Sequence, residues 1–189
     1  MKALKHKTFE AYETNLSYIP RVLAVVLIMV STLLTSDLSA GEAPAVFFLV
    51  RHAEKADAGA DPELTPAGRQ RAADLAGLLL DAGISAVHST DYVRTRDTAA
   101  PLAQRLGLEV LSYDPRQLDA FATQLRTQGG RHLVVGHSNT TPDLAAKLGG
   151  EAGTEIDEPR EYDRLYIVTI SDGGSVSTTL LRFGQRFNP

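Results

Sequence analysis

Five residues of this chain have side chains suited to phosphoryl chemistry, and they follow short apolar runs. Arg51 and His52 come directly after "AVFFLV", Arg94 and Arg96 lie in "STDYVRTRDT", and His137 follows "HLVVG". Arginine presents a planar fork of donors that matches phosphate oxygens. A neutral imidazole can attack phosphorus, and its pKa near 6.5 leaves it unprotonated at working pH. If the fold brings these residues together, they would suit a dianionic phosphoryl group.

The elements that must position these residues alternate along the chain. Short apolar or β-branched runs are separated by segments with helical spacing, in which apolar residues recur at i, i+3, i+4 and i+7. This alternation predicts an α/β fold, a three-layer sandwich with a mainly parallel sheet and helices on both faces. The predicted strands are 45–50, 85–89, 108–113, 132–136 and 164–170. The helical faces are Ala72, Leu75, Ala76 and Leu79, then Leu118, Phe121, Ala122 and Leu125.

Local signals mark the ends of these elements. A capping residue followed by proline is typical of a helix start. Three pairs fit that pattern: Thr65-Pro66, Asp114-Pro115 and Thr141-Pro142. Near the end of the chain, "SDGG" separates the runs 164–170 and 175–183. The sequence therefore predicts a hairpin there, which adds an antiparallel edge strand to the sheet.

The predicted sheet explains why charged residues follow apolar ones. In open α/β sheets, ligands bind outside the carboxyl ends of the strands. The run before Arg51 is apolar throughout, as expected for a central strand covered on both faces. We therefore expect Arg51, His52 and His137 to converge on one rim of the sheet, with Arg94 and Arg96 near the same edge.

The composition narrows the function. The chain has 189 residues and a formal net charge of -4, which does not favour nucleic acid as a partner. Cysteine is absent, so disulfides and thiolate metal sites are excluded. A zinc site made of several histidines stays open, although the spacing lacks the usual H-x-x-x-H or H-x-H. We expect one domain, residues 41–189.

The N-terminal segment predicts export. Lysines and an arginine precede the apolar run at 22–34, which is too short to span a bilayer comfortably. The run fits a secretory signal peptide covering residues 1–40, with small residues before Ala40 for cleavage. The predicted location is periplasmic or secreted. Two alternatives are a retained membrane anchor through 22–34 and a buried core helix.

Four ordered motifs resemble the histidine phosphatase superfamily, the phosphoglycerate mutase-like group. "RHAEK" at 51–55 resembles the R-H-G/A signature, and "LTPAGRQRAADLAGLL" resembles the helix that follows it. "STDYVRTRDTAAPLA" is similar to the segment carrying the family's second arginine, in a register that selects Arg94. "LVVGHSNT" resembles the strand that delivers the second histidine, His137.

This resemblance implies roles for four of the five residues. His52 would be the nucleophile and would form a phosphohistidine intermediate. Arg51, Arg94 and His137 would hold the phosphoryl oxygens, and no metal or cofactor would be required. Each residue also has a purely structural alternative. Arg51 and His52 could be a surface pair at a strand end, Arg94 could lie at a solvated helix start, and His137 could be a core histidine.

The general acid is the point where the sequence departs from the family. In the acid phosphatase branch an Asp follows the second histidine, but here that residue is Ser138. In the mutase-like branch a Glu follows the third strand, and Asp114 stands at about that place. Asp114 is equally a helix cap, and Glu54 is the other candidate. Phosphohistidine or phosphoanhydride substrates would demand less of an acid.

The sequence therefore predicts a metal-independent phosphatase acting on a phosphomonoester or a related phosphoryl compound. Its partner would be a small phosphorylated substrate or inorganic phosphate. A non-catalytic phosphate-binding module of the cell envelope and a mutase-like phosphotransferase are the alternatives. We further expect the polar segment 155–166 to fold over the pocket, with Tyr162 or Tyr166 as contacts.

Overall fold

The computed structural model describes residues 43–57 and 59–188, which fall within one compact unit, 42–189. The predicted signal peptide and its apolar run lie outside the described residues. No helix among the residues described is long and apolar enough to cross a membrane.

The described residues form a six-stranded sheet in the order β3-β2-β4-β1-β5-β6. Its strands are β1 (Ala45–Arg51), β2 (Ala86–Ser89), β3 (Val110–Ser112), β4 (Arg131–Gly136), β5 (Arg164–Ile170) and β6 (Val176–Arg182). The first four run parallel, which confirms the predicted α/β fold. β5 pairs antiparallel with both β1 and β6, so the predicted hairpin is confirmed. The antiparallel strand is second from the edge, and β6 forms the edge itself.

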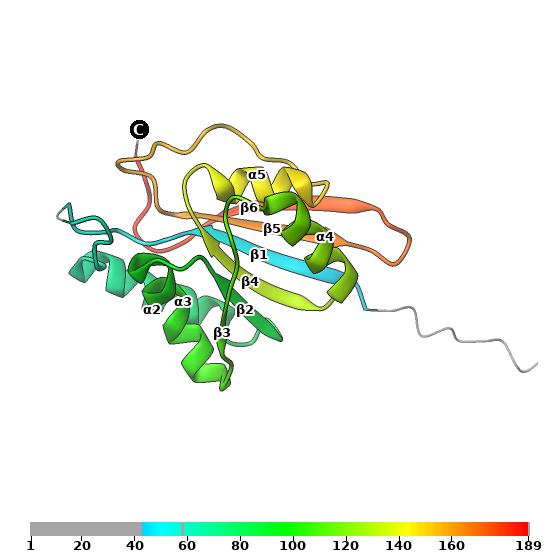
Figure 1. Ribbon diagram of the computed structural model, residues 1–189, viewed down its shortest axis with the longest axis horizontal. Helices are drawn as coiled ribbons and strands as arrows, with labels where there is room; N and C mark the ends of the chain where they lie inside the picture. Colours follow the sequence, from blue (N-terminus) through cyan, green and yellow to red (C-terminus); the bar gives the residue numbers. More distant parts are fainter. Residues whose placement is uncertain (1–42, 58, 189) are drawn as a thin grey trace, which may run out of the picture. The chain divides into compact units, whose positions relative to one another are not determined.

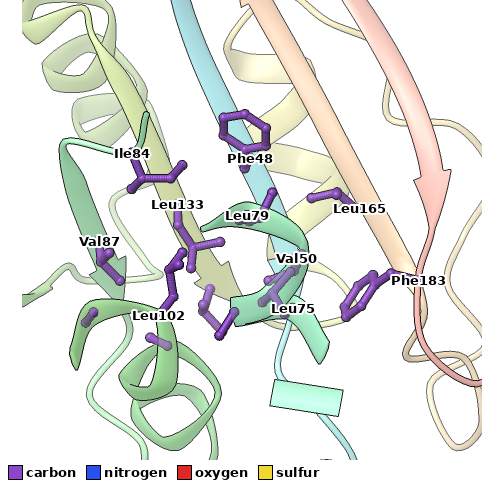
Figure 2. Packing of buried hydrophobic residues seen from close by; sticks show 14 of the residues in the cluster. Phe48, Val50, Leu75, Leu79, Ile84, Val87, Leu102, Leu133, Leu165 and Phe183 are labelled. Carbon is purple, nitrogen blue, oxygen red and sulfur yellow. The ribbon is translucent and has the colours of Figure 1, made fainter. Parts of the chain in front are cut away.

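Helices cover both faces of the sheet, as the sequence predicted (Figure 1). They are α2 (Pro66–Leu79), α3 (Val93–Leu106), α4 (Leu118–Gln128) and α5 (Thr140–Lys147). Successive side chains of a strand point to opposite faces. Phe48 and Val50 of β1 therefore pack with α2 and α3 in one core, where Leu75 and Leu79 meet them (Figure 2). Phe47 and Leu49 point the other way, into a core shared with α4 and α5. This double burial fixes the position of β1.

The helix starts agree with the sequence in one case and differ in two. Thr65 caps α2, since its side chain accepts a hydrogen bond from the Gly68 N–H. The capping predictions at Asp114-Pro115 and Thr141-Pro142 were wrong. Helix α4 begins three residues late, at Leu118, because the Asp114 carboxylate binds the Arg116 N–H in a tight turn. Helix α5 begins early, at Thr140, whose hydroxyl accepts from the His137 N–H.

The start of α2 lies directly against the segment that follows β1. The Thr65 N–H donates to the Glu54 carbonyl, 2.9 Å away. A Cβ added to Gly68 would collide with the same carbonyl oxygen, so only glycine fits at that position. The backbone two residues beyond His52 is thus held by α2.

Candidate active site

The carboxyl ends of β1 and β4 bring the predicted residues together. Arg51 is the last residue of β1, and it pairs with Gly136, the last residue of β4. The His52 N–H donates to the Gly136 carbonyl, 2.9 Å away. His137 follows directly, and its ring centroid lies 5.6 Å from that of His52. The two histidines therefore face one another across adjacent strand ends.

His52 has the form of a nucleophile. Its Nδ1 lies 2.8 Å from the carbonyl oxygen of Ala53, so Nδ1 carries the proton and Nε2 keeps its lone pair. The side chain is buried, and burial together with the charge of Arg51 lowers the pKa of His52 from 6.5 to about 3. Protonation is therefore suppressed at neutral and mildly acidic pH. The ring presents an unprotonated nitrogen held in one orientation.

Arg51 is buried beneath the segment that precedes β5. Its Nη1 donates to the Glu161 carbonyl at 3.0 Å, and its Nη2 donates to the Glu158 carboxylate at 2.9 Å. The guanidinium carbon lies 4.0 Å from the ring centroid of Tyr162. Burial lowers the pKa of Arg51, but the group stays charged near neutrality. Its Nε is buried and has no hydrogen-bond partner.

Arg94 approaches from the first turn of α3. Its guanidinium carbon lies 4.3 Å from the ring centroid of Tyr92, and its Nη1 lies 3.4 Å from the Asp61 carboxylate. Asp61 also accepts from the Val93 N–H, which caps the helix from a loop over thirty residues away. Like Arg51, Arg94 has a buried Nε without a partner.

His137 is oriented by hydroxyl groups. Its Nε2 lies 3.1 Å from Thr90 Oγ1, which in turn lies 3.0 Å from Thr95 Oγ1. Tyr92 packs edge-on against the ring, with centroids 5.2 Å apart. Burial and the charge of Arg94 lower the pKa of His137 to about 4. Both site histidines are therefore neutral at working pH.

A cavity of about 390 Å³ opens over these residues. Its lining residues are His52, Lys55, Tyr92, Arg94, Pro115, Arg116, His137, Ser138, Asn139, Thr140 and Glu158. A separate groove shares Tyr92, Pro115 and Arg116 with this cavity. Two arginines with unpartnered buried donors and two neutral histidines suit a dianion better than a neutral ligand.

Neither predicted general acid is free to act. Asp114 accepts from the Arg116 guanidinium and from Gln117, and these bonds lower its pKa to about 2. Its carboxylate is absent from the lining of the cavity over His52. Glu54 receives Nε and Nη2 of Arg71, on the side of α2. Asp114 thus closes a turn with Arg116 and caps no helix, so its alternative role as a helix cap is wrong as well.

The polar segment before β5 reaches the site, but the sequence predicted only some of its contacts there. Tyr162 lies beside His52, with ring centroids 6.0 Å apart. Tyr166 is buried and donates to the Ala152 carbonyl, so its expected contact with the pocket is wrong. The sequence missed Glu158 and Asp61 as neighbours of the two arginines. Only their place in loops at the carboxyl edge of the sheet could have suggested them.

No group of three or more metal-ligating side chains occurs within residues 43–57 and 59–188. His88 and His132 lie deeper in the sheet, where their rings stack with centroids 5.1 Å apart. This pair packs against Phe121 and Phe47 rather than against the cavity.

Fold and site together define an α/β domain in which two parallel strand ends and the start of α3 bring Arg51, His52, Arg94 and His137 to one edge of the sheet. The model of the histidine phosphatase superfamily (branch 1) matches residues 47–116, which confirms the resemblance seen in the sequence. The matched segment contains Arg51, His52 and Arg94, while His137 follows it.

Solved structures show the same fold. The protein histidine phosphatase SixA, complexed with tungstate, is 19% identical with a TM-score of 0.58, over 72% of this chain and 96% of that chain. A mycobacterial glucosyl-3-phosphoglycerate phosphatase with inorganic phosphate is 16% identical with a TM-score of 0.53, over 75% of this chain and 98% of that chain. No curated protein matches the sequence.

Proposed function

We propose that this protein is a metal-independent phosphatase that works through a phosphohistidine on His52. The observation that carries the proposal is the state of His52. Its Nε2 is unprotonated, its Nδ1 is fixed on the Ala53 carbonyl, and it lies next to Arg51 on the same strand end. The match to the histidine phosphatase superfamily supports the phosphatase class. Tungstate and inorganic phosphate bound in the two related structures support a phosphoryl ligand.

The reaction would take two steps. In the first, His52 Nε2 forms a bond to phosphorus as the bond to the leaving group breaks. Arg51, Arg94 and His137 would stabilise the charge on the phosphoryl oxygens. Loss of one such donor typically raises the barrier by about 2.7–4 kcal/mol. In the second step, water attacks phosphorus, phosphate leaves, and His52 regains its lone pair.

The experiment measures hydrolysis of p-nitrophenyl phosphate by the full chain in excess EDTA. The reaction is then quenched without acid, and mass spectrometry identifies the phosphorylated peptide. We expect turnover in EDTA and a phosphoryl group on the peptide that contains His52. Turnover that requires an added metal would contradict the proposal, as would a phosphoryl group on another residue.

A non-catalytic phosphate-binding module is the second candidate, favoured by the way Asp114 and Glu54 are both held by arginines. It predicts tight phosphate binding with turnover at background. Phosphoryl transfer of the mutase kind would instead return the labelled phosphoryl group to a rearranged product. Release of free phosphate as the sole labelled product would exclude transfer.

We also propose that the chain is exported, on the basis of the basic start, the apolar run at 22–34 and the small residues before Ala40. The test is N-terminal sequencing of the protein from cell fractions. A soluble form in the envelope or the medium that begins near Gly41 is expected. A full-length form extracted only by detergent would indicate a retained anchor instead.

A further inference from the structure

The unassigned proton donor is the open question of the site, and one side chain stands in the right place. Glu158 is the only carboxylate that lines the cavity over His52 within the part of the chain that the structure describes. Its Oε1 lies 2.9 Å from Arg51 Nη2, the guanidinium of the residue before the nucleophile. A carboxylate oxygen there occupies a donor that a phosphoryl oxygen would use.

The rest of the side chain is exposed to solvent. The Glu158 side chain is 60% exposed, whereas the Arg51 side chain that it binds is 1% exposed. Arg51 is the one hydrogen-bond partner that the described structure gives to the Glu158 carboxylate. By contrast, Asp114 and Glu54 each receive several donors from arginines. Glu158 thus has the fewest bonds to lose of these three carboxylates, and a phosphoryl group that takes its place would keep the buried Arg51 paired.

The turn that carries Glu158 is anchored from behind. The Glu161 N–H donates to the Asp157 carbonyl at 2.8 Å, which closes the turn. The Glu161 carboxylate is buried and accepts from Arg164 and Arg182, each at 2.7 Å. These bonds hold the turn that carries Glu158 in place, which a site needs for positioned chemistry.

We propose that Glu158 is the general acid of the reaction, released for that role when the substrate takes its place on Arg51. This inference rests on the proposed function. A dianionic phosphoryl group beside the carboxylate favours protonation of Glu158, because like charges disfavour the ionised form. Tyr162 lies against Arg51, the residue that Glu158 binds. Lys55, Arg94 and Arg116 are the cations that line the cavity together with Glu158.

The proton balance is simple. As His52 Nε2 bonds to phosphorus and the bond to the leaving oxygen breaks, Glu158 gives its proton to that oxygen. Glu158 is then a carboxylate, and it takes a proton from the water that attacks the phosphohistidine. Phosphate leaves, His52 regains its lone pair, and Glu158 returns to solvent the proton that it took up when the substrate bound, as it pairs again with Arg51. No metal or other co-reactant enters either step.

The experiment compares Glu158→Gln with the parent on two esters, phenyl phosphate and p-nitrophenyl phosphate. The parameter is kcat/KM, which covers the steps up to phosphohistidine formation. Phenolate is the poorer leaving group and needs the proton more. We expect a loss of about 100-fold on phenyl phosphate, typical for a missing general acid. On p-nitrophenyl phosphate we expect a loss of at most a few-fold, and an undiminished inhibition by inorganic phosphate.

Two further variants sharpen the result. Glu158→Asp keeps an ionisable acid and should recover part of the lost rate on phenyl phosphate. Glu155→Gln changes an exposed carboxylate of the same segment that does not line the cavity, and it should match the parent on both esters. Circular dichroism would verify that each variant is folded.

The outcomes separate the two hypotheses. Equal losses on both esters would mean that Glu158 only positions Arg51, and this would overturn the inference. So would a Glu158→Gln variant with unchanged rates on both. If the parent hydrolyses neither ester and His52→Ala behaves identically, the proposed function itself fails.

Discussion

Two pairs of histidines meet in the part of the chain that the structure describes, one within the sheet and one just past its strand ends, and they differ in what surrounds them. His88 and His132 stack on each other, with Nε2 of the first 3.0 Å from Nδ1 of the second. His52 and His137 stand edge to face, 5.6 Å apart, at a cavity with two arginines. In both pairs, burial lowers the pKa. A lowered pKa is therefore common to both pairs. The free lone pair on His52 and the arginines around it are what distinguish the candidate site from the pair inside the sheet.

The largest expected difference between the pairs is in turnover. His52→Ala removes the proposed nucleophile and should lower kcat by at least about 10⁴-fold, the scale seen when a covalent nucleophile is deleted. His88→Ala should leave kcat of the folded chain nearly unchanged and lower the free energy of unfolding by about 2–3 kcal/mol, since it opens a hole beside His132. Initial rates and urea unfolding measure the two effects. Comparable losses of activity in both variants would contradict the assignment of His52 to the site and of His88 to the core.

The next effect tests the cations that only the first pair has. Arg94→Met should lower kcat/KM by about 10²–10³-fold, because it removes a preorganised donor from the developing phosphoryl charge. Arg126→Met is the matched control, since Arg126 binds the Leu148 carbonyl, a helix-end contact with no part in the cavity lining. A control that lost as much activity would assign the Arg94 effect to stability.

A smaller effect concerns acid stability. The unfolded chain protonates histidine near pH 6.5, whereas the folded chain resists it, to about pH 4 for His88. The unfolded state therefore binds more protons in this window, and the free energy of unfolding falls as pH falls from 6.5 towards 4. Replacing His88 and His132 together by leucine should reduce this fall. Urea titrations at several pH values would show it, and His52, His137 and the paired carboxylate of Glu161 contribute to the slope that remains.

The smallest effect is expected at Asp114. Asp114→Asn keeps the side-chain shape and removes a charge that serves an exposed arginine, so activity should fall by less than about threefold. Phenyl phosphate is the informative substrate, because a true acid would matter most there. A loss of the size expected for Glu158→Gln would restore Asp114 as proton donor.

The sequence was sufficient for the parts of the fold that local pattern determines. Apolar runs and helical spacing predicted the strands and both helix faces, and the carboxyl-end rule placed Arg51, His52, Arg94 and His137 on one rim. Two helix starts were missed because Asp114 and Thr140 use their side chains in local turns that compete with capping.

The rest of the site depends on contacts between distant segments. Glu158 meets Arg51 across more than a hundred residues, and Asp61 meets Arg94 across more than thirty. No spacing rule links such pairs, because the loops that bring them together are held by buried networks such as that of Glu161. The carboxylates nearest to the motifs in sequence, Glu54 and Asp114, are held by Arg71 and Arg116 instead.

The close approach of Gly68 to Glu54 has a consequence for how this chain can diverge. A methyl group at residue 68 would push the Glu54 backbone, and the nearest movable neighbour along the chain is the segment bearing His52. Exposed positions of α2 can drift freely, since they face water. Residue 68 cannot, although it touches no substrate. Descendants of this sequence that keep the activity should therefore conserve the glycine at residue 68 as well as the histidine at residue 52.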